Sequence, residues 1–146
     1  MKANNIMETE FESRSINEGF ARSAAACFIA QLDPTLDELG DVRTAVSEAV
    51  TNCIVHAYPD KIGRIMMRIR LFEDNTAEIT VRDWGCGIPD IDHAMEPLFT
   101  TGGEERSGMG FTIMSSFMDG LRVRSAPGRG TTVIMKKRIS VRSASK

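Results

Sequence analysis

The stretch Arg64–Gly87, RIMMRIRLFEDNTAEITVRDWGCG, decides the fold of this chain. Apolar and polar residues alternate along Arg64–Phe72 and again along Thr76–Asp83, a period of two residues that is typical of β-strands with one buried face. The turn residues Glu73-Asp74-Asn75 lie between the two runs, so the stretch predicts a β-hairpin. The second strand leads directly into a glycine-containing loop, Asp-Trp-Gly-Cys-Gly.

An amphipathic helix is predicted on the N-terminal side of this hairpin. Apolar residues recur at three- and four-residue steps over residues 17–31, which is the spacing of one face of a helix. Asp33-Pro34 ends this helix because proline cannot continue the backbone hydrogen-bond ladder. Before it, residues 9–13 alternate polar and apolar side chains and are expected to form a short edge strand.

A second helix should follow, over residues 35–58. Thr35 and Glu38 have the spacing of a capping box, in which each side chain binds the backbone N–H group of the other residue. We expect a break at Gly40, because glycine lowers helix stability. The apolar stripe that this helix buries consists of Val42, Ala45, Val46, Ala49, Val50, Cys53 and Ile54.

The remainder of the chain completes an α+β fold. Residues 85–108 hold several glycines and two prolines, too many breakers for one regular element, so we expect a long functional loop or lid. A helix over 110–118 and strands over 121–125 and 131–138 should follow. The predicted architecture is a two-layer α/β sandwich with its helices on one face of a mixed, mainly antiparallel sheet.

Composition limits the classes of protein to which the chain can belong. Its 146 residues, 42% hydrophobic and 26% charged, suit one globular domain, predicted over residues 1–139 with a disordered tail over 140–146. A net charge of −2 gives no broad electrostatic surface for nucleic acid or an anionic membrane. Three cysteines without CxxC spacing and no apolar run of membrane-spanning length favour a soluble protein of the reducing cytoplasm.

The second predicted helix carries the first candidate functional residues. Glu48, Asn52 and His56 are spaced by four residues and therefore lie on one helix face, opposite the apolar stripe. A carboxylate one turn from a carboxamide offers two hard oxygen ligands to Mg²⁺, which prefers a few protein oxygens together with phosphates and water. A solvated helix face with a local hydrogen bond explains the same spacing equally well.

The loop after the hairpin carries the second candidate site. Asp83 ends a strand and can accept a hydrogen bond from an exocyclic amine, and Gly85 and Gly87 let the backbone pass close to a flat ligand or a phosphate. A tight turn after a strand also favours aspartate and glycine. The alternative interpretation of this loop is therefore a plain turn.

A third, glycine-rich segment, Arg106-Ser107-Gly108-Met109-Gly110, leads into the predicted helix at 110–118. Backbone N–H groups at a helix start can bind a phosphate, and Arg106 adds a charge suited to a terminal phosphate. A flexible connector with a capped helix start is the alternative. Gly130-Thr131-Thr132, entering the last strand, is the least specific of the four motifs.

The order of these four motifs resembles the N, G1, G2 and G3 boxes of the GHKL ATPases, the Bergerat-fold superfamily that includes DNA gyrase, the MutL repair proteins and the histidine kinases. Within that superfamily, the chain is similar to the sporulation anti-sigma-F family, serine kinases of spore-forming bacteria. The resemblance covers nearly the whole chain. It is carried by Gly19–Arg22, Gln31–Thr35, Ser47–His56, Gly87–Asp90, Pro97–Thr101 and Arg106–Met114.

The resemblance implies a role for each box in binding ATP or ADP with Mg²⁺. Asn52 would hold the Mg²⁺ ion that bridges the phosphates, Asp83 would recognise the adenine amine, and Gly85 and Gly87 would make room for the base. Glu48 would be the general base for a serine hydroxyl, and Arg106 would stabilise the transferred phosphoryl group. The remaining nucleotide-binding residues that the resemblance implies are Thr100, Thr101, Gly108, Met109, Gly110 and Thr131.

The resemblance also implies partners. A homodimer is expected to bind and inhibit a sporulation sigma factor (sigma-F) of RNA polymerase and to phosphorylate a serine of a STAS-type anti-anti-sigma protein, and both partners are expected to compete at Arg22. Three alternatives stay open: an anti-sigma kinase of a stress-response pathway, an ATP-sensing binding module with little turnover, and a detached histidine-kinase catalytic domain. The presence of Glu48 favours an enzyme over a pure sensor.

Overall fold

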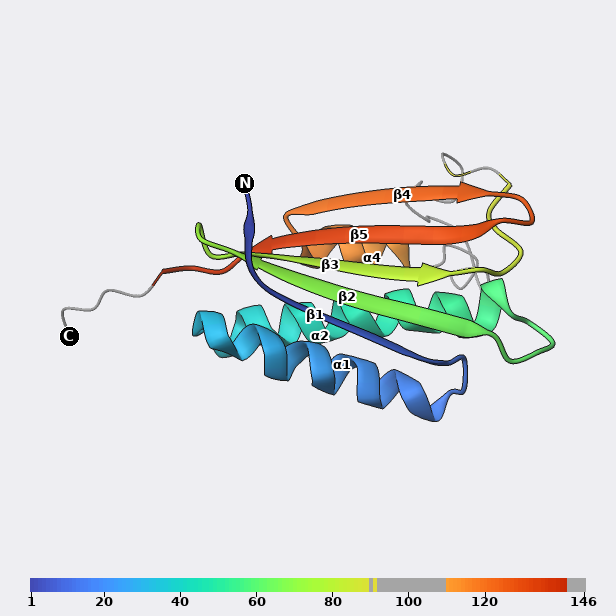
Figure 1. The fold of residues 1–146 in the computed structure, drawn as a ribbon, viewed down its shortest axis with the longest axis horizontal. Coiled ribbons are helices and arrows are strands. Elements are labelled where there is room, and N and C mark those ends of the chain that lie inside the picture. Colours follow the sequence, from blue (N-terminus) through green and yellow to red (C-terminus); the bar gives the residue numbers. More distant parts are fainter. Residues whose placement is uncertain (90, 92–109, 142–146) are drawn as a thin grey trace.

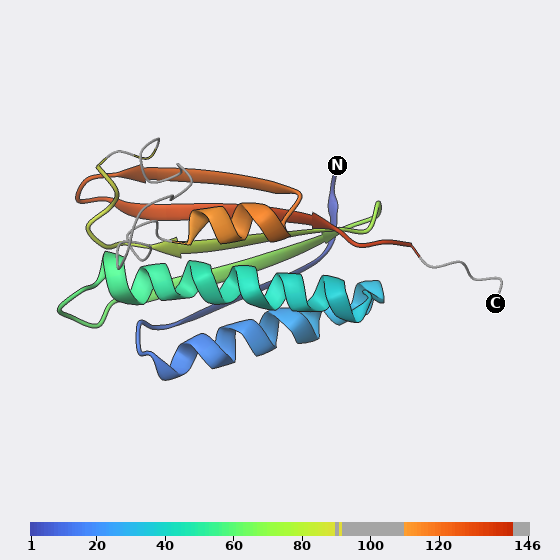
Figure 2. The same ribbon diagram turned by 180° about the vertical axis from the view of Figure 1, so that it is seen from behind.

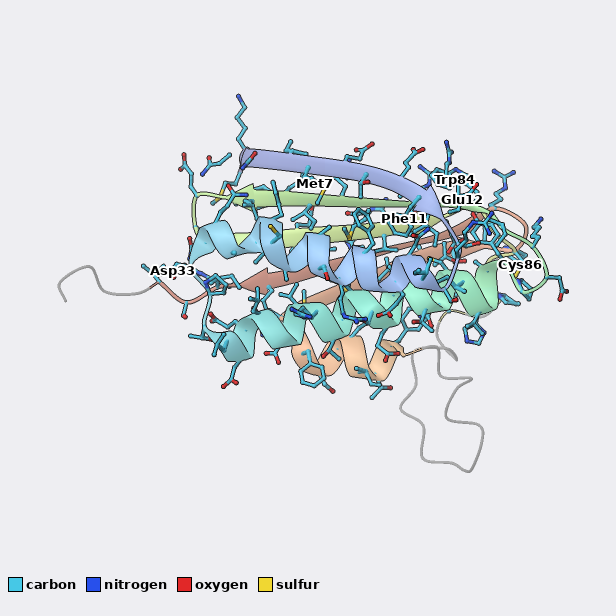
Figure 3. All side chains as sticks on the ribbon, turned by 90° about the horizontal axis from the view of Figure 1, so that it is seen from below. Met7, Phe11, Glu12, Asp33, Trp84 and Cys86 are labelled. Atoms are coloured by element: carbon cyan, nitrogen blue, oxygen red, sulfur yellow. The ribbon has the colours of Figure 1, made fainter. Side chains whose placement is uncertain are left out.

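The computed structural model describes residues 1–89, 91 and 110–141, which form a layer of helices packed on a sheet (Figure 1). In Figure 3, which is turned by 90°, β1 lies at the top of the view and α4 at the bottom, with α1 and α2 between them. The predicted α+β sandwich is therefore confirmed. In chain order the elements are β1 (Ala3–Glu12), α1 (Ile16–Ile29), the 3₁₀ turn η1 (Ala30–Leu32), α2 (Leu36–Asn52), the π-helical turn η2 (Cys53–Ala57), β2 (Arg64–Phe72), β3 (Thr76–Asp83), α4 (Phe111–Phe117), β4 (Gly120–Ala126) and β5 (Gly130–Arg138).

The sheet has the strand order β1-β2-β3-β5-β4, and each neighbouring pair among the described residues is antiparallel. The sheet is thus antiparallel in this part of the chain, where a mixed one was expected. The connections explain the difference. α1 and α2 carry the chain back and forth between β1 and β2, so β2 returns antiparallel to β1, and β5 separates β3 from β4, which run in the same direction.

The helices α1, α2 and α4 all lie on the same face of the sheet (Figure 2). α2 is the central helix, since it contacts both α1 and α4. Alternate residues of β2, namely Ile65, Met67 and Ile69, point toward these helices and are completely buried. They share one hydrophobic core with Val42, Val46, Val50, Phe111 and Met114.

α2 begins with the predicted capping box. The Glu38 N–H group donates to Thr35 Oγ1 (3.0 Å), and Glu38 Oε1 accepts from the Thr35 N–H group (2.9 Å). The break expected at Gly40 was wrong, because the helix runs unbroken from Leu36 to Asn52. A glycine in a helix interior costs only about 1 kcal/mol relative to alanine, and burial of the apolar stripe of α2 outweighs that cost.

β1 is longer than the short edge strand expected at residues 9–13, because it pairs with β2 along almost its whole length. Met7 and Phe11 face inward and pack against the core (Figure 3). The Phe11 ring also meets the Phe20 ring of α1 edge-on, with 5.8 Å between the ring centroids. Glu8, Glu10 and Glu12 face outward, and pairing with β2 rather than local apolar patterning extends the strand toward its N-terminal end.

The end of β5 leads into a segment that stays attached to the fold. Ile139 is completely buried, and the Ser140 N–H group and hydroxyl both donate to the Glu38 carboxylate. Residues 142–146, most of the tail predicted to be disordered, lie outside the described residues. Within the described ranges, no helix combines the length and the apolar composition needed to cross a bilayer.

Candidate functional site

Four segments of the chain converge at one end of the sandwich. α2 passes into η2 there, β3 ends there, and α4 and β5 begin there (Figure 1). A pocket opens between them. Residues from motifs that are far apart in the sequence thus meet in one place. The polar lining consists of Asn52, His56, Asp83 and Thr131, and the apolar walls include Ile88, Phe111 and Val133.

Asp83, the last residue of β3, is held by backbone donors from two directions. Its Oδ1 accepts hydrogen bonds from the N–H groups of Gly85 (2.9 Å) and Thr131 (3.1 Å). The antiparallel register places Thr131 of β5 directly opposite Asp83. Only 4% of Asp83 is exposed. Burial raises the pKa of Asp83 and outweighs the hydrogen bonds from Gly85, Cys53 and Thr131, which lower it.

Tyr58 fixes the start of the loop that follows Asp83. The Tyr58 hydroxyl donates to the Arg64 carbonyl (2.7 Å) and accepts from the Trp84 N–H group (2.7 Å). The hydroxyl therefore uses both its donor and an acceptor site, as a buried tyrosine normally does. It links the end of η2 to the start of β2 and to the loop, a role that the sequence alone does not suggest.

Gly85 is packed directly on the end of η2. A Cβ atom here would lie 2.3 Å from the Ala57 carbonyl oxygen, and the Cys86 N–H group donates to that same oxygen (3.1 Å). Gly87 has a φ of +78°, and its Cβ would lie 2.1 Å from the Ala126 carbonyl oxygen. Contacts within the protein explain both glycines, and their predicted role of making room for a base stays a prediction.

The helix changes to π-helical geometry directly after Asn52. In η2 the Tyr58 N–H group bonds the Cys53 carbonyl five residues earlier (3.1 Å), and single π-helical turns are frequent at functional sites. The Asn52 side-chain nitrogen is buried and has no hydrogen-bond partner among the described residues. Because a buried amide without a partner is costly, this group is available to a ligand.

Glu48 lies one turn before Asn52 and beside the start of α4. A Cβ atom at Gly110 would lie 2.3 Å from Glu48 Oε1, and Gly110 has a φ of +73°. The glycine therefore lets the start of α4 approach this carboxylate. Burial raises the pKa of Glu48, and the negative charge of Glu18 on α1 raises it further. This is the direction expected of a carboxylate that accepts a proton near neutral pH.

A groove between α1 and α2 connects Glu48 with Arg22. Arg22 Nη1 donates to Glu18 Oε2 (2.6 Å), one turn earlier on α1, and Glu18 also hydrogen-bonds the Ser47 side chain. The predicted partner-contact residue and the predicted base are therefore in the same groove. Its lining consists of Arg22, Gly40, Arg43, Thr44, Ser47 and Glu48.

Comparisons with known proteins decide the family. Residues 11–137 match the family described as the histidine kinase-like ATPase domain. An anti-sigma F factor of Caldanaerobacter subterraneus subsp. tengcongensis is 58% identical over 140 residues, which are 95% of this chain and 97% of that relative. The anti-sigma F factor of Geobacillus kaustophilus is 54% identical over 93% of this chain and 94% of its own length. The chain belongs to the anti-sigma F factor family.

Membership of the anti-sigma F family confirms the resemblance found in the sequence. The histidine kinase-like ATPase domain that the chain matches is a nucleotide-binding domain.

Solved structures share the fold of this chain. The RsbU and RsbW domains of a Mycobacterium tuberculosis protein superpose with a TM-score of 0.68 at 17% identity, over 96% of this chain and 33% of that one. The histidine kinase domain of the Erythrobacter litoralis EL346 blue-light activated histidine kinase gives 0.58 at 22% identity, over 84% of this chain and 61% of that one.

The structure brings many of the predicted site residues of this anti-sigma F family member together, and their roles toward ATP stay predictions. The predicted residues in or beside the pocket are Glu48, Asn52, Asp83, Gly85, Gly87, Gly110 and Thr131. The predicted residues Thr100, Thr101, Arg106, Gly108 and Met109 lie outside the described residues.

Sequence reasoning missed side chains that shape the pocket. The Ser125 hydroxyl accepts from the Ile88 N–H group (2.8 Å) and contacts the Gly130 carbonyl (3.0 Å), so it ties the loop to the β4–β5 hairpin. Cys53, assigned only to the apolar stripe, donates its thiol to the Ala49 carbonyl (3.4 Å), and burial together with the neighbouring Asp83 raises the pKa of this thiol. For Cys53, the only local signal in the sequence is its position directly after Asn52. For Ser125 there is no such signal, because Ser125 and Ile88 are too far apart in the sequence for spacing to connect them.

The residues present fit the Mg²⁺ ion that the resemblance implies. Asn52 would offer its carboxamide oxygen and Glu48 a carboxylate oxygen one turn away, and the Asn52 side-chain nitrogen, which has no partner among the described residues, is a donor that suits a phosphate oxygen beside the ion. In the described ranges, no group of three or more histidine, cysteine, aspartate or glutamate side chains could hold a metal by itself. Mg²⁺ keeps water and phosphate ligands and takes few from the protein, so the Asn52 and Glu48 oxygens are compatible with an ion shared with a nucleotide.

Proposed function

We propose that this chain is an anti-sigma factor and an ATP-dependent serine kinase of the cytoplasm. As a homodimer it binds and inhibits a sporulation sigma factor of the sigma-F type, and it phosphorylates a serine of a STAS-type anti-anti-sigma protein. The observation that carries the proposal is the convergence of Asn52, Asp83 and Thr131 in one pocket, with Glu48 beside it. The 58% identity to a protein named anti-sigma F factor supports the partner class.

In the proposed site, Asp83 binds the exocyclic amine of adenine. Its carboxylate is already oriented by the N–H groups of Gly85 and Thr131, so it can accept a hydrogen bond without reorganising. The apolar side chains of Ile88 and Val133 line the same pocket. A flat base therefore finds an apolar wall and one well-placed acceptor, which is the usual composition of a small-ligand site.

Glu48 is the proposed general base, and it takes the proton of the acceptor serine. Its raised pKa makes it a better proton acceptor than an exposed glutamate. Asn52 would hold the Mg²⁺ ion, which when bound neutralises charge on the phosphates. Arg22 lies in the same groove as Glu48 and is the proposed contact for the protein partners, while Arg106 is proposed to stabilise the transferred phosphoryl group.

Phosphate transfer tests the proposal. The purified chain is incubated with Mg²⁺, γ-labelled ATP and a STAS-type anti-anti-sigma protein, and mass spectrometry identifies the modified residue. We expect label on a serine, and we expect Glu48→Gln to slow the transfer by about 100-fold or more because glutamine cannot accept the proton. ATP binding should persist in this variant, as measured by the fluorescence of Trp84, the only tryptophan of the chain.

The outcomes separate this proposal from its alternatives. Transfer at the normal rate by Glu48→Gln removes the general-base assignment. Binding of ATP and a sigma factor without serine labelling indicates an ATP-sensing binding module, and label on a histidine of a second protein indicates a detached histidine-kinase domain. Tighter binding of a stress-response sigma factor than of sigma-F contradicts the sporulation role.

A further inference from the structure

The face of the sheet opposite the helices has no helix over it in the described part of the chain (Figure 1). Outward-pointing residues of β2, β3, β4 and β5 form a shallow hollow on this face. The strand register places Arg68 beside Thr80, Thr80 beside Ile134, and Ile134 beside Arg122. The outward cations in and around this hollow are Arg68, Arg70, Arg82, Arg122, Arg124 and Lys136, and we call them the basic face; Arg64 and Arg138, at strand ends, also face outward and are not counted in it.

Most cations of the basic face form no ion pair within the described residues, although Glu8 of β1 lies directly opposite Arg68 in the strand register. Among the described residues, Glu78 is the only carboxylate in the lining of the hollow, and its Oε1 is held by Arg70 Nη2 at 2.6 Å. The ion pairs of the described residues include none made by Arg68, Arg122, Arg124 or Lys136. Because the whole chain carries a net charge of −2, this excess of positive charge is local.

Arg68 is partly desolvated at the centre of the hollow. Its Nε atom is buried and has no hydrogen-bond partner among the described residues, and its neighbour across the strands, Thr80, is only 4% exposed. A guanidinium N–H group that has lost water without gaining a partner is energetically unfavourable. A carboxylate over the hollow would satisfy it, because guanidinium and carboxylate form charge-assisted, often paired hydrogen bonds.

The distribution of charge favours an acidic protein segment over an extended polyanion. β1 carries Glu8, Glu10 and Glu12 on the same outward face. A DNA duplex or an anionic membrane would cover this acidic edge together with the basic strands and would be repelled there. No aromatic side chain lines the hollow among the described residues. The Phe72 and Trp84 rings beside it already stack against Arg70 and Arg82, so the bases of a single strand would have to displace these contacts in order to stack.

A second copy of this chain fits the face poorly. Its middle carries Arg68, Arg82 and the Arg70–Glu78 ion pair, whereas charged residues are depleted at the centres of homodimer interfaces. From β2 to β4 the cations span three strand spacings, roughly 14 Å. That width accommodates one helix of about 10–12 Å diameter.

We propose that the basic face binds an acidic segment of a partner protein, whose carboxylates contact Arg68, Arg122 and Arg124. The face lies on the side of the sheet away from α1 and α2 (Figures 1 and 2). A partner can therefore occupy it while the pocket and the Arg22 groove are engaged. This site is separate from the proposed kinase function and does not depend on it.

Binding of a defined acidic peptide tests the site. The full chain is titrated into a fluorescein-labelled oligoglutamate peptide at low salt, and the fluorescence anisotropy gives Kd. Arg122 and Arg124 are exposed on the edge strand β4, so the variant Arg122→Gln/Arg124→Gln should keep its fold. We expect its Kd to rise about tenfold. The control Lys61→Gln/Arg129→Gln removes the same charge from exposed positions outside the basic face, and its Kd should change by less than about twofold.

Several results would overturn the site. Equal weakening in the two double variants would mean non-specific attraction. Tighter binding of duplex DNA or of phosphatidylserine vesicles than of the peptide, lost in Arg122→Gln/Arg124→Gln, would assign the face to a nucleic acid or a membrane. A change of oligomeric state in that variant, seen by light scattering, would assign it to a second copy. Arg122→Gln/Arg124→Gln should label serine at the wild-type rate. Failure of the acidic peptide to bind would therefore overturn this site and leave the proposed function intact.

Discussion

The two ends of the sandwich are built with similar contacts and serve different purposes. We call the end of the sandwich opposite the pocket, where α2 begins and β5 ends, the closed end. There the Asn75 side chain donates to the Ile139 carbonyl (3.1 Å), and the Glu38 carboxylate accepts from Thr35 and Ser140. At the pocket end, the Asp83 carboxylate accepts from two backbone N–H groups. Figure 3 shows Asp33 at the closed end and Trp84 and Cys86 at the pocket end.

The two ends differ in how strongly hydrogen-bond donors offset the burial of their carboxylates. Burial by itself raises the pKa of Glu38, but hydrogen bonds from Thr35 and Ser140 outweigh burial and lower the pKa. For Asp83 and Glu48 burial dominates, and the pKa of each is raised. The comparison teaches that a carboxylate supplied with enough donors serves the fold, whereas one with too few is available for ligand chemistry.

The largest effect on stability should come from Gly85→Ala at the pocket end. The added Cβ would lie 2.3 Å from the Ala57 carbonyl oxygen, so the loop or η2 must move, and the free energy of unfolding should fall by about 3 kcal/mol. Gly128→Ala is the control, because nothing lies within 4 Å of its Cβ and only its φ of +77° opposes alanine, at a cost of about 1 kcal/mol. Urea denaturation measures both, and equal losses would contradict the packing explanation.

Asp83→Ala should rank next and should affect binding as well as stability. Two N–H groups lose their acceptor, so we expect a loss of about 2 kcal/mol in unfolding free energy and about 100-fold weaker ATP binding. Asp74→Ala at the closed end is the control, since that carboxylate accepts from the Thr76 N–H group at 3.2 Å in an exposed turn. Calorimetric titration with ATP measures the affinity. A similar loss of affinity in the control would mean that the two ends do not differ in function.

Thr35→Ala should show a smaller effect, confined to the closed end. The substitution removes the side-chain acceptor of the capping box and should lower the free energy of unfolding by about 1 kcal/mol. Thr35→Ser retains the hydroxyl and should lose less. ATP affinity should equal that of the wild type in both variants, and a marked decrease would show that the closed end influences the pocket.

The smallest effects should be the pH-dependent changes in melting temperature caused by Glu48→Gln and Glu38→Gln. We expect these two changes to be opposite in sign. The raised pKa of Glu48 means that its charge disfavours the folded state above that pKa, so Glu48→Gln should raise the melting temperature at neutral pH by about 1–2 °C. The lowered pKa of Glu38 means that its charge favours folding, so Glu38→Gln should lower the melting temperature there.

The difference in melting temperature between each variant and the wild type should vanish in acid, as the pH falls through the folded-state pKa of the substituted residue. The difference for Glu48 should close first, above its ordinary pKa of 4.5, and that for Glu38 should close below 4.5. Melting curves from neutral pH down to about pH 3 test this order. Closure in the reverse order would contradict the assignment of burial at Glu48 and of hydrogen bonding at Glu38.

Local patterns predicted most of the fold. The hairpin of β2 and β3, the capping box of Thr35 and Glu38, and the helix α4 depend on residues a few positions apart, so their signals are in the sequence. The full length of β1 was missed because pairing with β2, far along the chain, extends it. The continuity of α2 through Gly40 was missed because tertiary burial outweighs the local cost of glycine.

The candidate site was predictable as a set of residues and not as a geometry. The order of the motifs selects Glu48, Asn52, Asp83 and Thr131, and the structure places them in or beside one pocket. Their supports, Tyr58 and Ser125, were not predictable, because each bonds groups from strands and loops that only folding brings together.

The sequence by itself determined the periodicity of the strands and helices, the glycine loop after β3 and the order of motifs that indicates the family. The tertiary structure alone decided that Asp83 faces Thr131 and that, among the described residues, the Asn52 nitrogen is buried without a partner. It also decided that the outward cations of four strands gather on the face of the sheet opposite the helices. The physical reason is that periodicity is a property of neighbouring residues, whereas burial, desolvation and strand register depend on residues that are distant in the chain.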